Sequence, residues 1–150
     1  MAIAEQVSKG SKTEIPKIIS VDDHLVEPSH LWQTWLPNKF KEKGPRVERR
    51  RLGEMLWVGG SKMYEYELDT PDAPWCDIWF YEDLVYPNKR HVAAVGFARE
   101  EMTMSPITYD EMRPGCYEPK ARVEDMLSNH VEASLSFPTM PRFCGQTFTE

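Results

Sequence analysis

The chain lacks any long hydrophobic run and any excess of basic charge. None of its apolar stretches approaches the roughly 20 residues of a membrane-spanning helix, and residues 1–14, MAIAEQVSKGSKTE, contain no apolar signal core. With 18 Lys and Arg against 24 Asp and Glu, the 150 residues have a net charge of −6. This balance disfavours nucleic acid and membrane surfaces as partners. Four nearby arginines, which we interpret as a solvated strand or loop edge, are the local exception: Arg46, Arg49, Arg50 and Arg51.

Cysteine is scarce as well. Cys76, Cys116 and Cys144 are widely separated and form no C-x-x-C pair. An odd number of cysteines without a secretory context is typical of reduced thiols, and we therefore expect a cytoplasmic protein. No two cysteines have the spacing of zinc ligands, which disfavours a zinc site built from them. The hydrophobic content of 41% is ordinary for a globular protein and allows a real core.

The most informative segment is 17–28, with the sequence KIISVDDHLVEP. Its β-branched apolar run at 18–21 predicts a buried strand, and three ionisable residues follow at once. Because side chains alternate between the faces of a strand, we expect Asp22 and His24 on one face and Asp23 on the other. A carboxylate beside an imidazole at the carboxyl end of a buried strand is how a parallel α/β barrel presents metal ligands. The other interpretation is a strand that simply runs into a polar turn, since D-x-H alone is a weak pattern.

Two segments resemble the N-terminal part of amidohydrolase-superfamily proteins. The first surrounds Asp22 and reads VDDHLVEPSHLW. The second extends from Tyr109 to Gln146 and reads YDEMRPGCYEPKARVEDMLSNHVEASLSFPTMPRFCGQ. The similarity is to the amidohydrolase-related branch, which includes aminocarboxymuconate-semialdehyde decarboxylase and the dihydroxybenzoate decarboxylases. This resemblance implies a metal-dependent enzyme on a (β/α)8 barrel.

The resemblance also implies a site and a chemistry. The first strand of such barrels usually ends in His-x-His, and here Asp22 stands in the first His position and His24 in the second. The implied reaction is hydrolysis of an amide or related bond, or non-oxidative decarboxylation of a small organic acid. The implied cofactor is a divalent ion (zinc, manganese or iron), and a carboxylate ligand shifts the preference from zinc toward manganese or iron. Glu27 is a candidate for a further ligand or for a hydrogen-bond partner of the ligands.

The length of the chain limits what it can form alone. A (β/α)8 barrel needs on the order of 250 residues, whereas this chain has 150. The resemblance places the later ligands beyond Glu150, so we expect a truncated polypeptide or one piece of a split enzyme. A second chain or a missing C-terminal segment would then complete the barrel, in a homo- or hetero-oligomer that acts on a small-molecule substrate.

Two other functions stay open at this point. One is part of a dinuclear iron or manganese oxygenase of the same superfamily, for which the carboxylates of Asp22 and Glu27 would be suitable ligands. The other is a non-catalytic interaction subunit that completes or regulates another chain.

The predicted elements follow in the order strand, long excursion, helix, strand. We assign residues 1–16 to a flexible tail and 17–150 to an incomplete barrel domain, with the excursion at 28–108. Within the excursion, Gly59-Gly60 between two segments rich in strand formers predicts a hairpin. A short helix begins after Ser29, and its tryptophans are candidates either for a substrate pocket or for simple packing: Trp32 and Trp35.

Regular structure is predicted again after Tyr117. Pro119 suits the first turn of a helix, and residues 120–130 have the spacing of an amphipathic helix. Its apolar face would carry Val123, Met126, Leu127 and His130, with Glu124, Asp125, Ser128 and Asn129 facing away. Residues 131–137 alternate between apolar and polar side chains, which predicts a strand. A right-handed crossover would make this strand a parallel neighbour of the first one.

Overall fold

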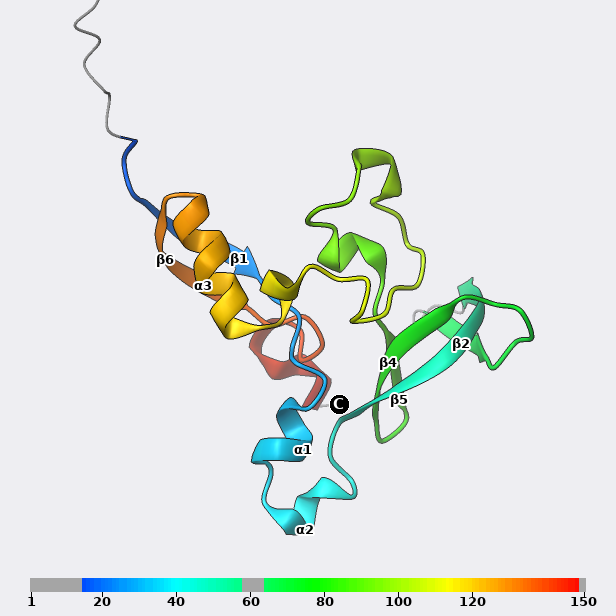
Figure 1. Cartoon of the computed structure of the whole chain (residues 1–150). Coiled ribbons are helices and arrows are strands. Elements are labelled where there is room, and N and C mark those ends of the chain that lie inside the picture. Colours follow the sequence, from blue (N-terminus) through cyan, green and yellow to red (C-terminus); the bar gives the residue numbers. More distant parts are fainter. Residues whose placement is uncertain (1–14, 58–63, 149–150) are drawn as a thin grey trace, which may run out of the picture.

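The structure is a computed structural model that describes residues 15–57 and 64–148 (Figure 1). Residues 1–14, most of the predicted tail, and the predicted Gly59-Gly60 turn lie outside the described residues. The fold is mixed α/β, with one parallel pair of strands and one antiparallel sheet of four strands. In the described ranges, no helix is long and apolar enough to cross a membrane.

The elements follow one another along the chain in the order expected for one β-α-β unit with a long excursion. The strands are β1 (Ile18–His24), β2 (Arg46–Trp57), β3 (Tyr64–Leu68), β4 (Trp75–Tyr81), β5 (Leu84–Pro87) and β6 (Val131–Phe137). The α-helices are α1 (Leu31–Trp35), α2 (Asn38–Lys41) and α3 (Pro119–Ser128). Short 3-10 helices are η1 (Arg90–Ala93), η2 (Arg99–Glu101), η3 (Pro114–Cys116) and η4 (Phe143–Phe148).

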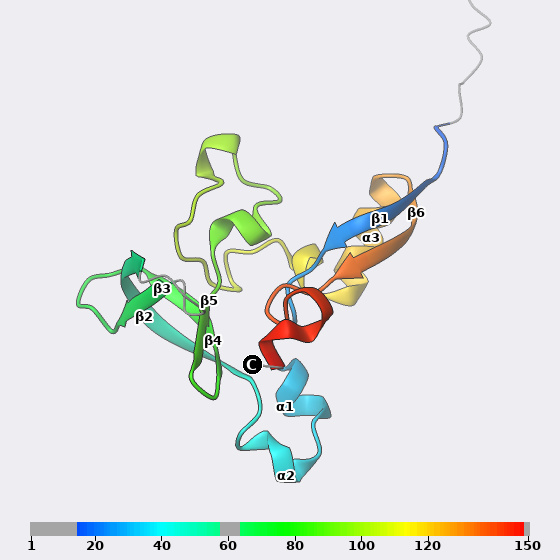
Figure 2. The ribbon, with the colours of Figure 1, turned by 180° about the vertical axis from the view of Figure 1, so that it is seen from behind.

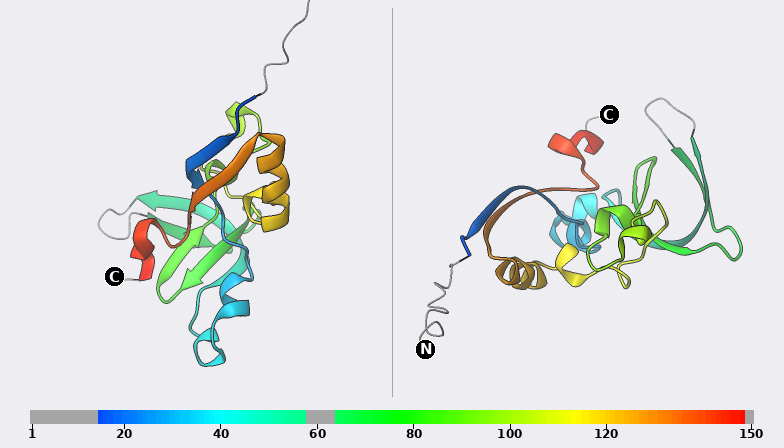
Figure 3. Two further views of the ribbon diagram at one scale, coloured as in Figure 1. Left: turned by 90° about the vertical axis from the view of Figure 1, so that its left-hand side faces the viewer. Right: turned by 90° about the horizontal axis from the view of Figure 1, so that it is seen from above.

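Strands β1 and β6 pair in parallel, from Ile18 opposite Val131 to His24 opposite Phe137. Helix α3 connects to β6 and lies along one side of the pair (Figures 2 and 3). The predicted parallel neighbours are thus confirmed, and so are the bounds predicted for β6. The pairing is irregular between Ser20 and Asp23, because β1 has one residue more than β6 over this stretch.

The prediction that the first strand is buried is wrong for the described part of the chain. Ile19 and Val21 are 68% and 66% exposed. The physical reason is that β1 has only β6 as a neighbour in its sheet, so its apolar side chains have little to pack against. Leu135 on β6 is exposed for the same reason.

Helix α3 exists as predicted, but the predicted buried face is wrong. Val123 and Leu127 are 53% and 70% exposed, whereas Arg122 and Asp125 are partly buried. Arg122 reaches Asp23 on β1, and Asp125 pairs with Arg113 beside η3. These two ion pairs determine which side of the helix faces inward. The helix also ends before His130, whose φ of 58° is left-handed.

The excursion contains a sheet in the order β3-β2-β4-β5, antiparallel throughout. The strands β2 and β3 confirm the two arms of the predicted hairpin. The hairpin of β4 and β5 was not predicted, because its aromatic sequence does not alternate clearly between apolar and polar residues. The arginine cluster lies on β2. Arg46, Arg49 and Arg50 form ion pairs with carboxylates, whereas Arg51 donates to the backbone carbonyl of Ala73.

Two buried clusters form the core. One lies against β2 and β4 and consists of Leu52, Cys76 and Ile78. The other lies between the excursion and the end of β1 and consists of Val26, Ala93, Ile107, Tyr109, Met112 and Cys116. The second cluster therefore joins the antiparallel sheet to the β1–β6 unit, at the end of β1 that carries the predicted ligands.

Candidate functional site

The predicted ligand pair lies side by side at the carboxyl end of β1. His24 Nε2 is 3.7 Å from Asp22 Oδ1, and the two side chains are 65% and 85% exposed. Two donor atoms that each lie about 2 Å from the same metal ion can be at most about 4 Å apart. The placement of Asp22 and His24 on one face is confirmed, and their separation fits a single ion. The His24 ring also lies 5.8 Å from the ring of Phe137 on the neighbouring strand.

Asp23 faces the other way, as the alternation of the strand predicts. Its carboxylate accepts hydrogen bonds from Ser20 Oγ at 2.8 Å, from Arg122 Nη2 at 2.8 Å and from Ser134 Oγ. Hydrogen bonds from Ser134 and Ser20, together with the charge of Arg122, hold the pKa of Asp23 below its ordinary value against the opposing effect of burial. Asp23 therefore ties β1 to β6 and to α3, and keeps the strand that carries Asp22 and His24 in place.

Glu27 is not brought together with the pair. Its buried carboxylate accepts the backbone N–H of Thr139 at 2.8 Å and of Met140 at 3.1 Å, one on each oxygen. Within residues 15–57 and 64–148, no group of three or more His, Cys, Asp or Glu side chains could hold a metal ion. Glu27 instead fixes the loop after β6 to the segment after β1. Of the three predicted ligands, the structure thus brings only Asp22 and His24 together.

The tryptophans of α1 differ from each other. Trp35 is largely exposed, whereas Trp32 is partly buried and packs edge-to-face on Phe148 at 5.5 Å between ring centroids. Phe148 in turn packs on Tyr81 of β4 at 5.3 Å. Trp32 therefore joins α1, η4 and β4. A role of Trp32 or Trp35 in a substrate pocket stays a prediction.

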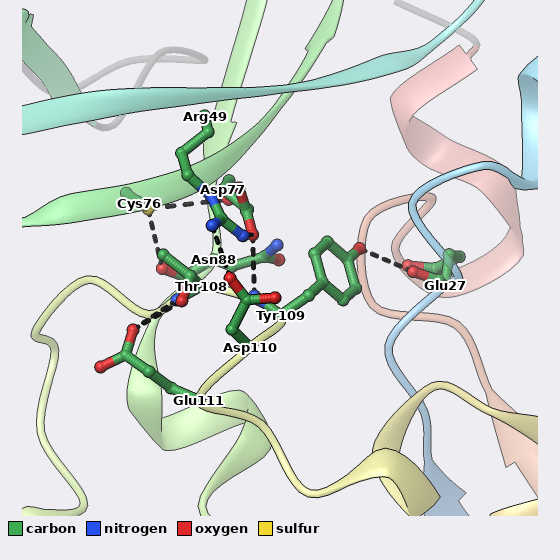
Figure 4. A network of polar contacts seen from close by, with 9 residues as sticks. All are labelled: Glu27, Arg49, Cys76, Asp77, Asn88, Thr108, Tyr109, Asp110 and Glu111. Carbon is green, nitrogen blue, oxygen red and sulfur yellow. Dashed lines mark hydrogen bonds and ion pairs between the residues drawn. The ribbon is translucent and has the colours of Figure 1, made fainter.

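A polar network, exposed at Arg49 and buried at Asp77 and Tyr109, connects the antiparallel sheet to the end of β1 (Figure 4). Arg49 donates two hydrogen bonds of 2.8 Å to Asp77, and Asp77 accepts the backbone N–H of Tyr109 at 2.8 Å. The Tyr109 hydroxyl then donates to the backbone carbonyl of Glu27 at 2.7 Å. This network places Glu27, and with it the carboxyl end of β1, relative to the excursion.

Burial and pairing shift the pKa values in this network. Burial raises the pKa of the Tyr109 hydroxyl, which therefore keeps its proton and remains a donor to Glu27. Hydrogen bonds to Asp77 and Asp110 raise the pKa of Arg49, so this guanidinium is charged at all working pH values. The network is thus a permanent ion pair with a neutral phenol at its end, which suits a structural clamp.

Sequence reasoning missed Asp77 and Tyr109, although one signal for Asp77 was present. An acidic residue stands in the middle of an otherwise apolar strand, WCDIWFY, from residue 75. Because an unpaired buried carboxylate is costly, such a residue requires a cationic or N–H partner. The pattern does not say which partner, because Arg49 is 28 residues and Tyr109 is 32 residues away in sequence.

No family model matches this chain, and no curated protein matches it.

Proposed function

We propose that this chain carries part of the active site of a metal-dependent enzyme of the amidohydrolase type. Asp22 and His24 would be two ligands of one divalent ion at the carboxyl end of the first strand of a (β/α)8 barrel. The observation that carries the proposal is the position of this pair: adjacent, on one face, and at the end of a strand that has a parallel β-α-β neighbour. In parallel barrels, catalytic groups are found at this end of the strands.

The donor set fits a divalent ion but does not complete its coordination. A divalent ion held there would act as a Lewis acid. Asp22 contributes a negative oxygen donor, which favours manganese or iron over zinc alone, and His24 must be neutral to bind. Asp23, between the two residues, and Glu27, three residues after His24, hold the backbone that carries the pair. Further ligands would come from a second chain or from another segment, in a homo- or hetero-oligomer.

The reaction that this site would serve is hydrolysis of an amide or related bond, or decarboxylation of a small organic acid. Both reactions use a metal to polarise or bind an oxygen of a small-molecule substrate. The exposure of Asp22 and His24 leaves room on their face for the remaining ligands and for the substrate. A dinuclear oxygenase site has less support, because both oxygens of Glu27 already accept backbone N–H groups.

A non-catalytic interaction subunit is the second candidate, and one observation favours it. The β1–β6 unit exposes a group of large apolar side chains on both strands and on α3: Ile18, Ile19, Val21, Val123, Leu127 and Leu135. Exposed apolar surface beside open strand edges is typical of a surface that another element covers. This function would need the surface but not the Asp22–His24 pair.

Metal analysis separates these functions. The assembly is purified, dialysed against manganese, zinc or iron(II), and its metal-to-protein ratio is measured for the wild type and for Asp22→Ala, His24→Ala and His30→Ala. We expect one metal ion per site in the wild type, its loss in the first two variants and its retention in His30→Ala, because exposed His30 lies outside the pair. Two redox-active ions per site would instead support the oxygenase. A wild type without metal would contradict the enzyme proposal and leave the interaction subunit.

A further inference from the structure

Lys89 is a buried lysine that the proposed metal site does not use. It lies two residues after the end of β5, and only 9% of its surface is exposed. Its backbone forms an antiparallel bridge with Pro106, which fixes the position of the residue beside the segment around Pro106. Lysine is almost never buried to this extent without an acidic partner. Across residues 15–57 and 64–148, no ion pair joins Lys89 to a carboxylate.

The amine lies in a box of aromatic rings and one thioether. Lys89 Nζ donates to Tyr66 Oη at 3.2 Å and lies 3.3 Å from Met55 Sδ. The ring centroids of Tyr64 and Tyr66 are 5.0 Å and 5.3 Å from Nζ. Met55 and Tyr66 are direct partners across β2 and β3, so the sheet register itself builds the box.

Two opposing effects act on the charge of this amine. The ring faces favour the ammonium form, whereas the loss of hydration disfavours it. Burial lowers the pKa of Lys89 below its ordinary value, against a smaller opposing effect of Cys76. Burial also raises the pKa of Tyr66 to about 12, so its hydroxyl keeps its proton at neutral pH. An amine whose neutral form is easier to reach than that of an exposed lysine therefore lies within hydrogen-bond distance of a neutral phenol.

We propose that Lys89 is a reactive amine that forms an imine with a small aldehyde or ketone, with Tyr66 as the proton carrier. Desolvation in an apolar site is one of the ways in which proteins make a lysine nucleophilic toward carbonyl groups. The geometry that carries the proposal is the box of Met55, Tyr64 and Tyr66 around an amine that pairs with no carboxylate of the described residues. The proposal does not depend on the metal site.

The reaction balances without any oxidant or reductant. The lone pair of Nζ attacks the carbonyl carbon, the π electron pair of the C=O bond moves to oxygen, and one N–H proton is transferred to that oxygen. The resulting carbinolamine loses its hydroxyl as water, which takes its second proton from Tyr66 Oη. The nitrogen lone pair forms the C=N bond, and the remaining N–H proton returns to the phenolate oxygen. The sum is amine plus carbonyl compound giving imine plus water.

Competitive labelling of the lysines tests this proposal on the unmodified full chain. The folded protein is treated at neutral pH with limiting formaldehyde and cyanoborohydride, which traps imines as methylated amines, and the extent at each lysine is read by peptide mass mapping. We expect Lys89 to be labelled ahead of the exposed Lys43 and Lys120, by about tenfold for each unit by which its pKa is lowered. Burial without reactivity predicts the reverse order, with Lys89 last, and that result would overturn the proposal.

Two controls complete the experiment. In concentrated guanidinium the preference for Lys89 should disappear, whereas a preference that persists would come from local sequence and contradict the role of the box. Tyr66→Phe should slow the labelling of Lys89 relative to Lys120 more than Tyr64→Phe does, because the Tyr66 hydroxyl accepts a hydrogen bond from Nζ. Far-ultraviolet circular dichroism verifies that both variants are folded. Equal labelling of Lys89 in the two variants would overturn the role of Tyr66.

Discussion

Similar apolar residues have different environments in the antiparallel sheet and in the parallel pair β1–β6. In β4 of the antiparallel sheet, Ile78 and Trp79 are fully buried. In β1 of the parallel pair, Ile19 and Val21 are mostly exposed, although both strands have the composition of core strands. The difference follows from the number of covering elements: β4 has strands on both sides, whereas β1 has one neighbour in its sheet. The excursion thus contains its own buried cluster, whereas the β1–β6 unit exposes apolar side chains on both strands.

Charged residues show the same contrast. Asp77 in the antiparallel sheet is buried and is satisfied by Arg49 and by a backbone N–H. Asp22 and His24 on β1 face solvent and contact mainly each other. Carboxylates that stabilise a fold are usually surrounded by donors, whereas groups that bind a ligand must leave coordination positions open. The contrast agrees with a stabilising role for Asp77, and it is consistent with the proposal that the pair on β1 is functional.

The largest expected effect comes from making the same substitution in both regions. Ile78→Ala should lower the free energy of unfolding by about 2–5 kcal/mol, because it leaves a cavity in a closed core. Ile19→Ala should change it by about 0.5 kcal/mol or less, because this side chain is exposed. Urea unfolding followed by tryptophan fluorescence measures both values. Equal losses would mean that β1 is covered in solution and would break the comparison.

A second pair of substitutions compares neighbouring carboxylates on β1. Asp23→Ala should cost about 1–3 kcal/mol of unfolding free energy, because it leaves Arg122 and two serine hydroxyls without their acceptor. Asp22→Ala should be close to neutral for stability. The same urea experiment, run without added metal, measures both. If Asp22→Ala lowered the free energy of unfolding more than Asp23→Ala, the structural role assigned to Asp23 would be contradicted.

Removing the hydrogen bond from Tyr109 to Glu27, which connects the two regions, should lower the free energy of unfolding by a smaller amount. Tyr109→Phe removes one hydrogen bond, to the backbone carbonyl of Glu27, and should cost about 0.5–1.5 kcal/mol. Because the ring itself remains, the packing of the buried cluster should be preserved. Thermal unfolding measures the loss, and Tyr117→Phe is the matched control on the ring that packs edge-to-face against Tyr109. An equal loss in the control would contradict the role of the Tyr109 hydroxyl.

The smallest expected effect is a pH dependence that belongs to Asp23. Its pKa in the folded protein is lowered from the ordinary value of 3.8. The unfolded chain therefore binds more protons between the folded-state pKa and 3.8, so the stabilisation is complete above 3.8 and is lost as the pH falls through the folded-state pKa. Asp23→Asn should remove this part of the acid destabilisation. Unfolding midpoints across this range for both proteins test it, and an unchanged pH profile would contradict the hydrogen-bonded environment of Asp23.

The elements of the β-α-β unit could be predicted because each has a clear period. Residues 131–137 alternate and form β6, and the proline and apolar spacing after Tyr117 predict α3. The faces of these elements could not be predicted equally well. The side of α3 that faces inward carries Arg122 and Asp125, whose ion-pair partners Asp23 and Arg113 lie outside the helix. The spacing of apolar residues along the helix gives no information about such ion pairs.

The candidate site divides in the same way. The shared face of Asp22 and His24 follows from strand alternation alone. The true partners of Glu27 do not, because they are backbone N–H groups of a loop more than a hundred residues later in the chain. Strand β4 was missed because consecutive side chains from Cys76 to Trp79 are buried, on both faces of the strand, which removes the alternation that marks a half-exposed strand.

The central claim is that Asp22 and His24 hold one metal ion together, and a residue-specific titration tests it most directly. The chain has four histidines, so their imidazole proton resonances can be followed individually by NMR while zinc, a diamagnetic probe, is added. The account predicts that the His24 resonance shifts first and saturates at one zinc ion, that the shift is lost in Asp22→Ala, and that it persists in Asp23→Asn. A His24 resonance that never shifts, or one that shifts equally in Asp22→Ala, would contradict the claim.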